Sequence, residues 1–221
     1  MNVCAFIGWR PRVALGLATL VTLPLVASCA SDTVRQGRGG SYLIIDALEG
    51  ASGALECDEF GTSVPSDVIT YVKKKLSGGD EIEVPTIFED CGRVRARLAL
   101  KNIGSATSPT EPTANNFITI TRYRVLYKRA DGRNTPGVDV PYPFDGGMTL
   151  TVGDQPATAG FLLVRAQAKE EAPLIAIARG GGAIGITTIA EITFYGADQA
   201  GNDVTATGSL TINFSNYGDP D

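Results

Sequence analysis

The side chains that could carry out chemistry are few in type, and they exclude several classes of enzyme. The 221-residue chain contains no histidine, which excludes a Ser-His-Asp triad, a Cys-His pair and any zinc site with imidazole ligands. Carboxylate pairs remain available for glycosidase chemistry. With 24 Asp and Glu residues, however, some pair lies close in almost any fold, so the pairs indicate nothing specific. We therefore predict no enzyme activity, no cofactor and no metal ion.

The N-terminal segment has the organisation of a secretory signal. Arg10 and Arg12 precede an apolar run over residues 13–27. This run is about the length of a signal-peptide h-region and is short for a membrane span. It ends in Val26-Ala27-Ser28-Cys29, which resembles the lipobox of bacterial lipoproteins. An ordinary secretory signal with a chance cysteine, or a retained membrane helix, is the alternative.

The resemblance implies that the chain is cleaved before Cys29 and that this cysteine carries a diacylglycerol, with a further acyl chain on its new amine. Two or more acyl chains hold a protein stably on a bilayer. Ala30 follows the cysteine, where the family's inner-membrane retention signal has an aspartate. The resemblance therefore implies anchoring to the outer membrane, with the domain facing the periplasm or the outside.

Two further cysteines lie beyond the N-terminal segment. Cys57 and Cys91 form an even pair in a compartment that permits disulfides. Their spacing is not the C-x-x-C of a catalytic redox pair. We predict a structural disulfide between them, with two buried free thiols as the alternative.

The charge balance limits the choice of partners. The whole chain has a formal charge of −5, and the signal removes two arginines and no acid, so the mature chain is more acidic still. Nucleic acids and anionic headgroups are bound by clustered Lys and Arg. Lys73-Lys74-Lys75 is the only basic run and is interpreted as a solvated surface. We predict no nucleic-acid partner.

The chain divides into four segments. Residues 1–28 are the predicted signal peptide, and residues 218–221 are a C-terminal tail. Residues 29–40, with three glycines among their last four positions, are the lipidated cysteine and a flexible tether. Residues 41–217 are predicted to form a single β-sandwich domain.

Hydrophobic patterning predicts strands through most of this domain. One short helix is expected over residues 169–179, although Pro173 fits only in its first turn. Residues 102–116 are predicted to form a loop, and residues 54–60 and 67–74 are ambiguous. The expected strands cover residues 42–48, 93–101, 117–129, 148–152, 159–167, 184–195 and 204–214.

The strand over residues 117–129 has the clearest alternation, and its period of two predicts two faces. The face expected toward the core contains Phe117, Thr119, Thr121, Tyr123, Val125 and Tyr127. The opposite face contains Ile118, Ile120, Arg122, Arg124 and Leu126.

Seven to eight strands with little helix favour an antiparallel immunoglobulin-like β-sandwich. The last two strands are joined by residues 196–203, a loop rich in turn formers. This hairpin resembles the closing hairpin of bacterial immunoglobulin-like and fibronectin-III-like modules. Trp9 lies in the signal, so the buried tryptophan of antibody domains is missing. A small eight-stranded barrel is the alternative.

The loop over residues 131–147 is the main candidate binding site. Its prolines stiffen the backbone, and aromatic rings on such a loop can stack on sugars or anchor a partner. The alternative is that these side chains fold back and cap one end of the domain. The candidate residues are Asp139, Tyr142, Phe144 and Asp145.

Two other motifs have simpler interpretations. Asp198, Asn202 and Asp203 could supply oxygen ligands to calcium, but a plain turn uses the same residue types. Residues 180–185 match G-x-G-x-x-G. They follow a predicted helix and open a strand, whereas a dinucleotide site requires the reverse order.

Together these features predict a lipid-anchored lipoprotein of the cell envelope, attached to the membrane through Cys29. We expect its domain to act as a non-enzymatic structural or protein-interaction module. The alternative is a lipid-anchored domain that binds a glycan or another small ligand through the 131–147 loop.

Overall fold

The structure is a computed structural model that describes residues 39–180 and 184–217. The predicted signal peptide, Cys29 and the 218–221 tail lie outside the described residues. Within those residues the chain forms twelve strands and two short α-helices, so the prediction of a mainly β domain is confirmed. No helix in this part of the chain is long and apolar enough to span a membrane.

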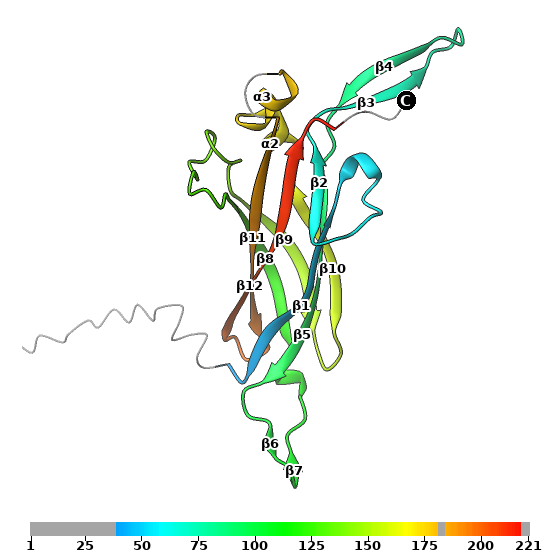
Figure 1. Ribbon diagram of the computed structural model, residues 1–221. Coiled ribbons are helices and arrows are strands. Elements are labelled where there is room, and N and C mark those ends of the chain that lie inside the picture. Colours follow the sequence, from blue (N-terminus) through cyan, green and yellow to red (C-terminus); the bar gives the residue numbers. More distant parts are fainter. Residues whose placement is uncertain (1–38, 181–183, 218–221) are drawn as a thin grey trace, which may run out of the picture.

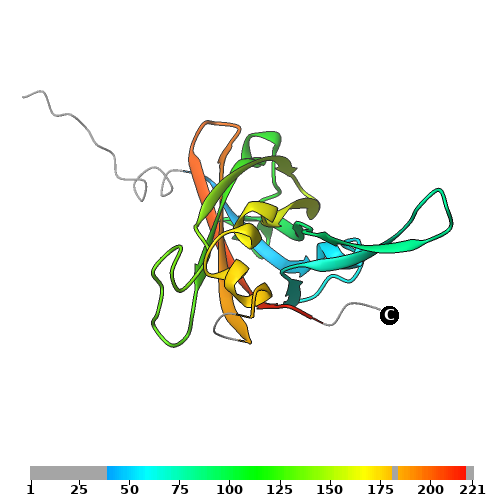
Figure 2. The same cartoon turned by 90° about the horizontal axis from the view of Figure 1, so that it is seen from above.

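The larger sheet has five strands in the order β2-β12-β11-β8-β9 and curls into a half-barrel (Figures 1 and 2). Its neighbours pair antiparallel except for β2 and β12, which are parallel. The strands are β2 (Ser63–Asp67), β8 (Ile118–Lys128), β9 (Phe144–Val152), β11 (Gly185–Asp198) and β12 (Asp203–Ser215).

A three-stranded antiparallel sheet faces the half-barrel and shares its core. It consists of β1 (Ser41–Ala51), β5 (Asp90–Leu100) and β10 (Ala157–Val164), in the order β1-β5-β10. At its two edges, β1 contacts β12 and β10 contacts β9. The two sheets therefore surround one hydrophobic core.

Aromatic side chains fill the centre of this core. Tyr123 and Phe194 from the larger sheet pack against Phe161 from the smaller sheet, with ring centroids 5.1 and 5.5 Å from that of Phe161. Burial of each large apolar side chain contributes about 1.5–3 kcal/mol. The contacts between the rings therefore hold the two sheets together.

Two hairpins project from the body of the domain (Figure 1). One is formed by β3 (Thr70–Lys75) and β4 (Glu81–Thr86), and the other by the two-residue strands β6 (Gly104–Ser105) and β7 (Ser108–Pro109). The segment 102–116, predicted as a loop, therefore contains a small hairpin. The single-turn 3-10 helices η1 (Gly53–Leu55) and η2 (Ala114–Asn116) complete the described elements.

The arrangement differs from the antiparallel immunoglobulin-like sandwich that the patterning favoured. The parallel pairing of β2 with β12 and the projecting β3–β4 hairpin are not part of such a sandwich. Both occur in the stretch between β1 and β5, where the sequence is ambiguous. Strand β4 carries charged residues at Glu81 and Glu83 and a proline at Pro85, which mask its strand pattern.

The single helix expected over residues 169–179 is instead two short helices, α2 (Ala166–Glu170) and α3 (Leu174–Ala178). Pro173 lies between them as the N-cap residue of α3. A proline has no amide hydrogen, and its ring restricts the preceding residue to extended conformations. The helix therefore ends before the proline and starts again after it.

The predicted faces of residues 117–129 are wrong in the first half of the strand. Ile118 and Ile120 are buried, whereas Thr121 and Arg122 are both exposed. The cause is a β-bulge. Tyr195 of β11 pairs with Arg122 and Gly196 pairs with Ile120, which leaves Thr121 without a partner residue. One extra residue reverses the alternation on one side of the bulge.

Candidate functional site

A surface depression lies on the outer face of the five-stranded sheet, near the turn between β11 and β12. Its volume is about 630 Å³. Half of its lining residues have polar, uncharged side chains. The lining residues come from β8, β11 and β12 and from the turn, and they are Thr119, Thr121, Arg122, Thr193, Tyr195, Gly196, Ala197, Asp198, Gln199, Asp203, Val204 and Thr205.

The bulge in β8 shapes this depression. Because the register shifts at Thr121, this residue and Arg122 are both exposed on the outer face. Gly196 makes the shift possible, since a Cβ atom at this position would collide with the backbone carbonyl of Thr119. Bulges often occur beside functional sites, where they redirect a side chain.

The β11–β12 turn forms the rim of the depression and is tied down at several points. The Asp198 carboxylate accepts hydrogen bonds from the backbone amides of Ala200 and Asn202, and from the Asn202 side chain. Gln199 donates from its backbone to the carbonyl of Phe117 and from its side chain to the Thr119 hydroxyl. The rim is therefore fixed to the start of β8.

These bonds also bear on the calcium interpretation of Asp198, Asn202 and Asp203. Both Asp198 carboxylate oxygens are engaged within the turn, as expected for a residue that holds a turn. Across residues 39–180 and 184–217, no three His, Cys, Asp or Glu residues cluster in a way that could hold a metal ion.

Charged residues on one side of the depression are paired. The Arg122 guanidinium lies 3.9 Å from the ring centroid of Tyr195 and donates to Asp145 at 2.7 Å. Arg124 donates to the other oxygen of the same carboxylate at 3.2 Å. Asp145, predicted as part of a binding loop, therefore lies on β9 and fixes two arginines on the outer face.

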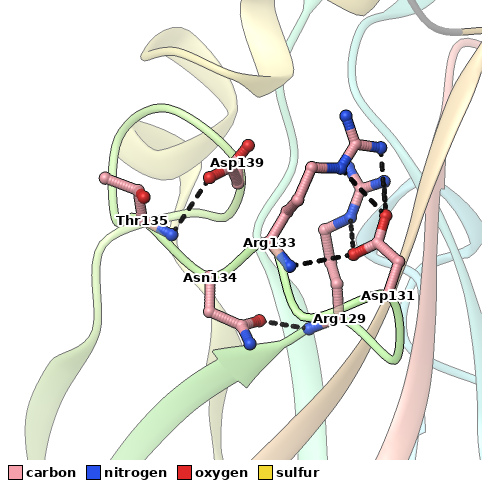
Figure 3. A network of polar contacts seen from close by, with 6 residues as sticks. All are labelled: Arg129, Asp131, Arg133, Asn134, Thr135 and Asp139. Carbon is pink, nitrogen blue, oxygen red and sulfur yellow. Dashed lines mark hydrogen bonds and ion pairs between the residues drawn. The ribbon is translucent and has the colours of Figure 1, made fainter.

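The 131–147 loop is held mainly by its own polar groups (Figure 3). Asp131 accepts hydrogen bonds from the guanidinium groups of Arg129 and Arg133. The bonds from Arg129, followed by that from the Arg133 amide, hold the pKa of the Asp131 carboxyl well below its usual range. Asp139 accepts from the Thr135 amide at 3.2 Å, so its carboxylate also stabilises the loop.

The two aromatic residues predicted for this loop lie in different environments. Phe144 is the first residue of β9, and its ring is buried between Tyr123 and the Arg165 guanidinium. Tyr142 is half exposed, and its ring lies over Gly137, where a Cβ atom would overlap it. The structure therefore does not bring the four candidate residues together at one exposed aromatic surface.

The predicted disulfide is present. Cys57 and Cys91 are bonded, with their Cα atoms 5.8 Å apart. The bond connects the segment after η1 to β5. Asp90, the residue before Cys91, lies in the core and pairs with Lys169 of α2. Neither charged side chain reaches solvent. We therefore interpret the ion pair and the adjacent disulfide as parts of the core that stabilise the fold.

Comparison with known proteins identifies no relative, since the chain matches no protein-family model, no curated protein and no solved structure. The fold and the site thus define a mainly β domain with a polar depression on the outer face of its larger sheet. The predicted lipobox, residues 26–29, lies outside the described residues, as does half of the G-x-G-x-x-G motif, residues 181–183.

Among the residues that line the depression, the sequence pattern indicated Asp198 and Asp203, as possible calcium ligands, and did not indicate the threonines or Tyr195. A period of two places Thr121 on the core face, because the period does not allow for the extra residue of the bulge. Gly196, which pairs with Ile120, is the one available signal. A glycine within a strand often marks a bulge or a close approach of two backbones. Which glycine does so is visible only when the two strands are paired.

Proposed function

We propose that this protein is a lipid-anchored lipoprotein of the outer membrane whose domain acts as a non-enzymatic protein-interaction or structural module. The observation that carries the proposal is the Val26–Cys29 lipobox after an apolar run, followed by a short glycine-rich segment. The domain then begins at β1. The complete lack of histidine supports the non-enzymatic part, because this residue is the commonest metal ligand and a frequent general acid and base.

In this proposal the domain is a variant of the immunoglobulin-like or fibronectin-III-like sandwich. Two sheets on one core and the closing β11–β12 hairpin support this assignment. The parallel strand β2 and the β3–β4 hairpin are additions to the basic plan. Sandwiches of this kind present loops and hairpins at their ends, where partners bind.

The direction of β1 supports an interaction role for the far end of the domain. β1 begins at the end that carries β6–β7, whereas α2, α3 and the β3–β4 hairpin lie at the opposite end (Figure 1). An anchor that precedes β1 leaves this opposite end facing away from the membrane. Val72, Leu76 and Ile82 of the hairpin region are each at least 39 % exposed, and in this proposal they supply apolar surface for the contact with a partner.

The anchor is tested by the Cys29→Ala variant, with Cys4→Ala as the matched control in the same predicted signal. We expect the unaltered protein and the control to fractionate with membranes. Mass spectrometry of their N-terminal peptide should show a chain that begins at Cys29 and carries acyl groups. Cys29→Ala should lose both properties. A processed chain that begins elsewhere, or that has no acyl group, would contradict the proposal.

The second candidate function is glycan or small-ligand binding through the 131–147 loop. Buried Phe144 and the self-contained polar network of this loop give it little support. Tyr142 is the remaining exposed aromatic ring there. The interaction module is therefore the better supported of the two functions.

A further inference from the structure

We infer that the depression on the outer face of the five-stranded sheet is a binding site for a neutral oligosaccharide. This inference rests on the proposed function, because it names a ligand for the domain that the lipid is proposed to anchor. The site differs from the 131–147 loop, and it is formed by β8, β11, β12 and the β11–β12 turn.

The lining matches the hydrogen-bonding pattern of a sugar. Four threonines from three adjacent strands line the depression. The Thr119 hydroxyl is bonded to Gln199 and Thr151, and the Thr193 hydroxyl is bonded to Thr207. A hydroxyl has one donor and two acceptor positions, so each of these two keeps at least one position for a ligand. The Gln199 side-chain amide on the rim donates one N–H to Thr119 and adds its second N–H as a donor and its carbonyl oxygen as an acceptor. Sugar hydroxyls also donate and accept, so such a ligand can satisfy this surface. The four threonines are Thr119, Thr121, Thr193 and Thr205.

The depression also has apolar surface beside these polar groups. Tyr195 is half-buried and contributes the part of its ring that the Arg122 guanidinium does not cover, and Gly196 and Ala197 add no large side chain. A sugar ring has apolar C–H faces as well as hydroxyls. A site with an aromatic ring and a few placed polar groups is typical of small-ligand recognition.

The charges favour an uncharged ligand. Arg122 is the cation of the lining, and its guanidinium is bonded to Asp145. Asp198 is engaged within the turn, and Asp203 adds a second carboxylate. An anionic ligand would therefore meet two carboxylates and a cation that already has a partner. A neutral ligand avoids this repulsion and the cost of removing a charge from water.

The site is held in shape before any ligand binds. Gly196 allows the close approach of β8 and β11 at the bulge, and hydrogen bonds from Gln199 hold the turn against β8. A preformed site loses less conformational entropy on binding. The volume of about 630 Å³ lies within the range of roughly 300–1,000 Å³ that is usual for ligand pockets.

The test uses the full mature chain in a detergent without a sugar headgroup. Isothermal titration calorimetry would measure binding of cellotriose, maltotriose, mannotriose and chitotriose, with trigalacturonic acid as the anionic comparison. We expect at least one neutral trisaccharide to bind and the acid to bind more weakly. Thr121→Val removes one hydroxyl at nearly constant shape, and this should weaken binding about fivefold.

Thr121→Arg should abolish binding, because a long charged side chain would occupy the depression. Thr149 of β9 is exposed on the same sheet but does not line the depression, so Thr149→Val and Thr149→Arg are the matched controls and should bind normally. Near-UV circular dichroism would verify folding of all four variants. The inference is overturned if no neutral trisaccharide binds, if the acid binds best, or if the Thr149 variants lose binding equally.

These measurements separate the inference from the proposed function. Sugar binding in detergent does not depend on the fatty chains. If the protein binds a trisaccharide but is not acylated at Cys29, the inferred sugar site stands and the proposed anchor is wrong. If the protein is acylated at Cys29 but binds no trisaccharide, the proposed anchor stands and the inferred sugar site is wrong.

Discussion

The ammonium nitrogen of Lys169 lies 2.9 Å from a carboxylate oxygen of Asp90, and neither side chain has any exposed surface. Asp90 also accepts hydrogen bonds from the Gly53 amide and the Ser66 hydroxyl. The carboxylate therefore connects α2, η1 and β2 to β5, next to the disulfide. Without these partners a buried charge would be very costly.

We predict that Lys169→Met lowers the free energy of unfolding by about 3–5 kcal/mol, because it leaves the Asp90 carboxylate buried without a counterion. Urea denaturation at neutral pH would measure the change. The double variant Lys169→Met/Asp90→Leu should cost less than the sum of the two single variants. Lys128→Met, which removes an exposed ion pair with Glu191, should cost less than about 1 kcal/mol. Equal effects at Lys169 and Lys128 would show that the buried pair has no special role.

The Cys57–Cys91 bond should contribute substantially to stability. Its cysteines are 34 residues apart in sequence, and closing a loop of this length stabilises the fold by about 3–4 kcal/mol in the chain-entropy model. We expect Cys57→Ala/Cys91→Ala to lose about this amount in urea denaturation. Labelling of the denatured, unreduced mature protein with a thiol reagent gives an independent check, and two reactive thiols would exclude the bond.

Gly196 and Gly147 provide a matched pair of glycines for testing the bulge. A Cβ atom at Gly196 would collide with backbone atoms of Thr119 and Ile120, whereas nothing lies within 4 Å of one at Gly147. Gly196→Ala should therefore destabilise the domain by more than about 2 kcal/mol, and Gly147→Ala should be close to neutral. Thermal unfolding of both variants measures this. A harmless Gly196→Ala would mean that the bulge does not require glycine.

Tyr127 should make the domain sensitive to alkali. Its hydroxyl is fully buried and donates to the Leu163 carbonyl at 2.8 Å. Burial, and to a lesser degree the nearby Asp90 carboxylate, raise the pKa of this phenol above its ordinary value, which is about 10. The fold favours the neutral phenol, so its stabilising effect is complete below pH of about 10 and is lost as the pH rises further.

Spectrophotometric titration of the tyrosines would therefore show Tyr127 ionising only as the domain unfolds. Tyr127→Phe should lose about 1–3 kcal/mol at neutral pH, because the buried Leu163 carbonyl loses its donor. The same variant should show a shallower decline in stability above pH of about 10. A Tyr127 signal that titrates normally in the folded protein would contradict this prediction.

Strand β8 shows how far sequence patterning reaches. Its existence and its approximate bounds follow from alternation, and its second half has the predicted faces, with Tyr123, Val125 and Tyr127 in the core. Its first half has the reverse faces because of the bulge at Thr121. A bulge depends on the pairing partner, and no local pattern in the strand itself reveals it.

The segment 169–179 shows a different limit. The sequence correctly indicated helix, and it indicated that Pro173 was a difficulty. It did not predict two helices, because a proline near a helix start and a proline that divides two helices have similar local patterns. Packing of Leu174 and Ile177 into the core decided the second helix.

By itself, the sequence determined the mainly β character and the closing β11–β12 hairpin, since these depend on local periodicity and turn residues. It also determined the partner of each domain cysteine, because the domain contains two cysteines. The tertiary structure alone decided which strands pair, that β2 runs parallel to β12, that Phe144 is buried, and that Thr121 and Tyr195 line one depression. These features arise from contacts between segments distant in sequence, and such contacts are set by how two sheets pack around one core.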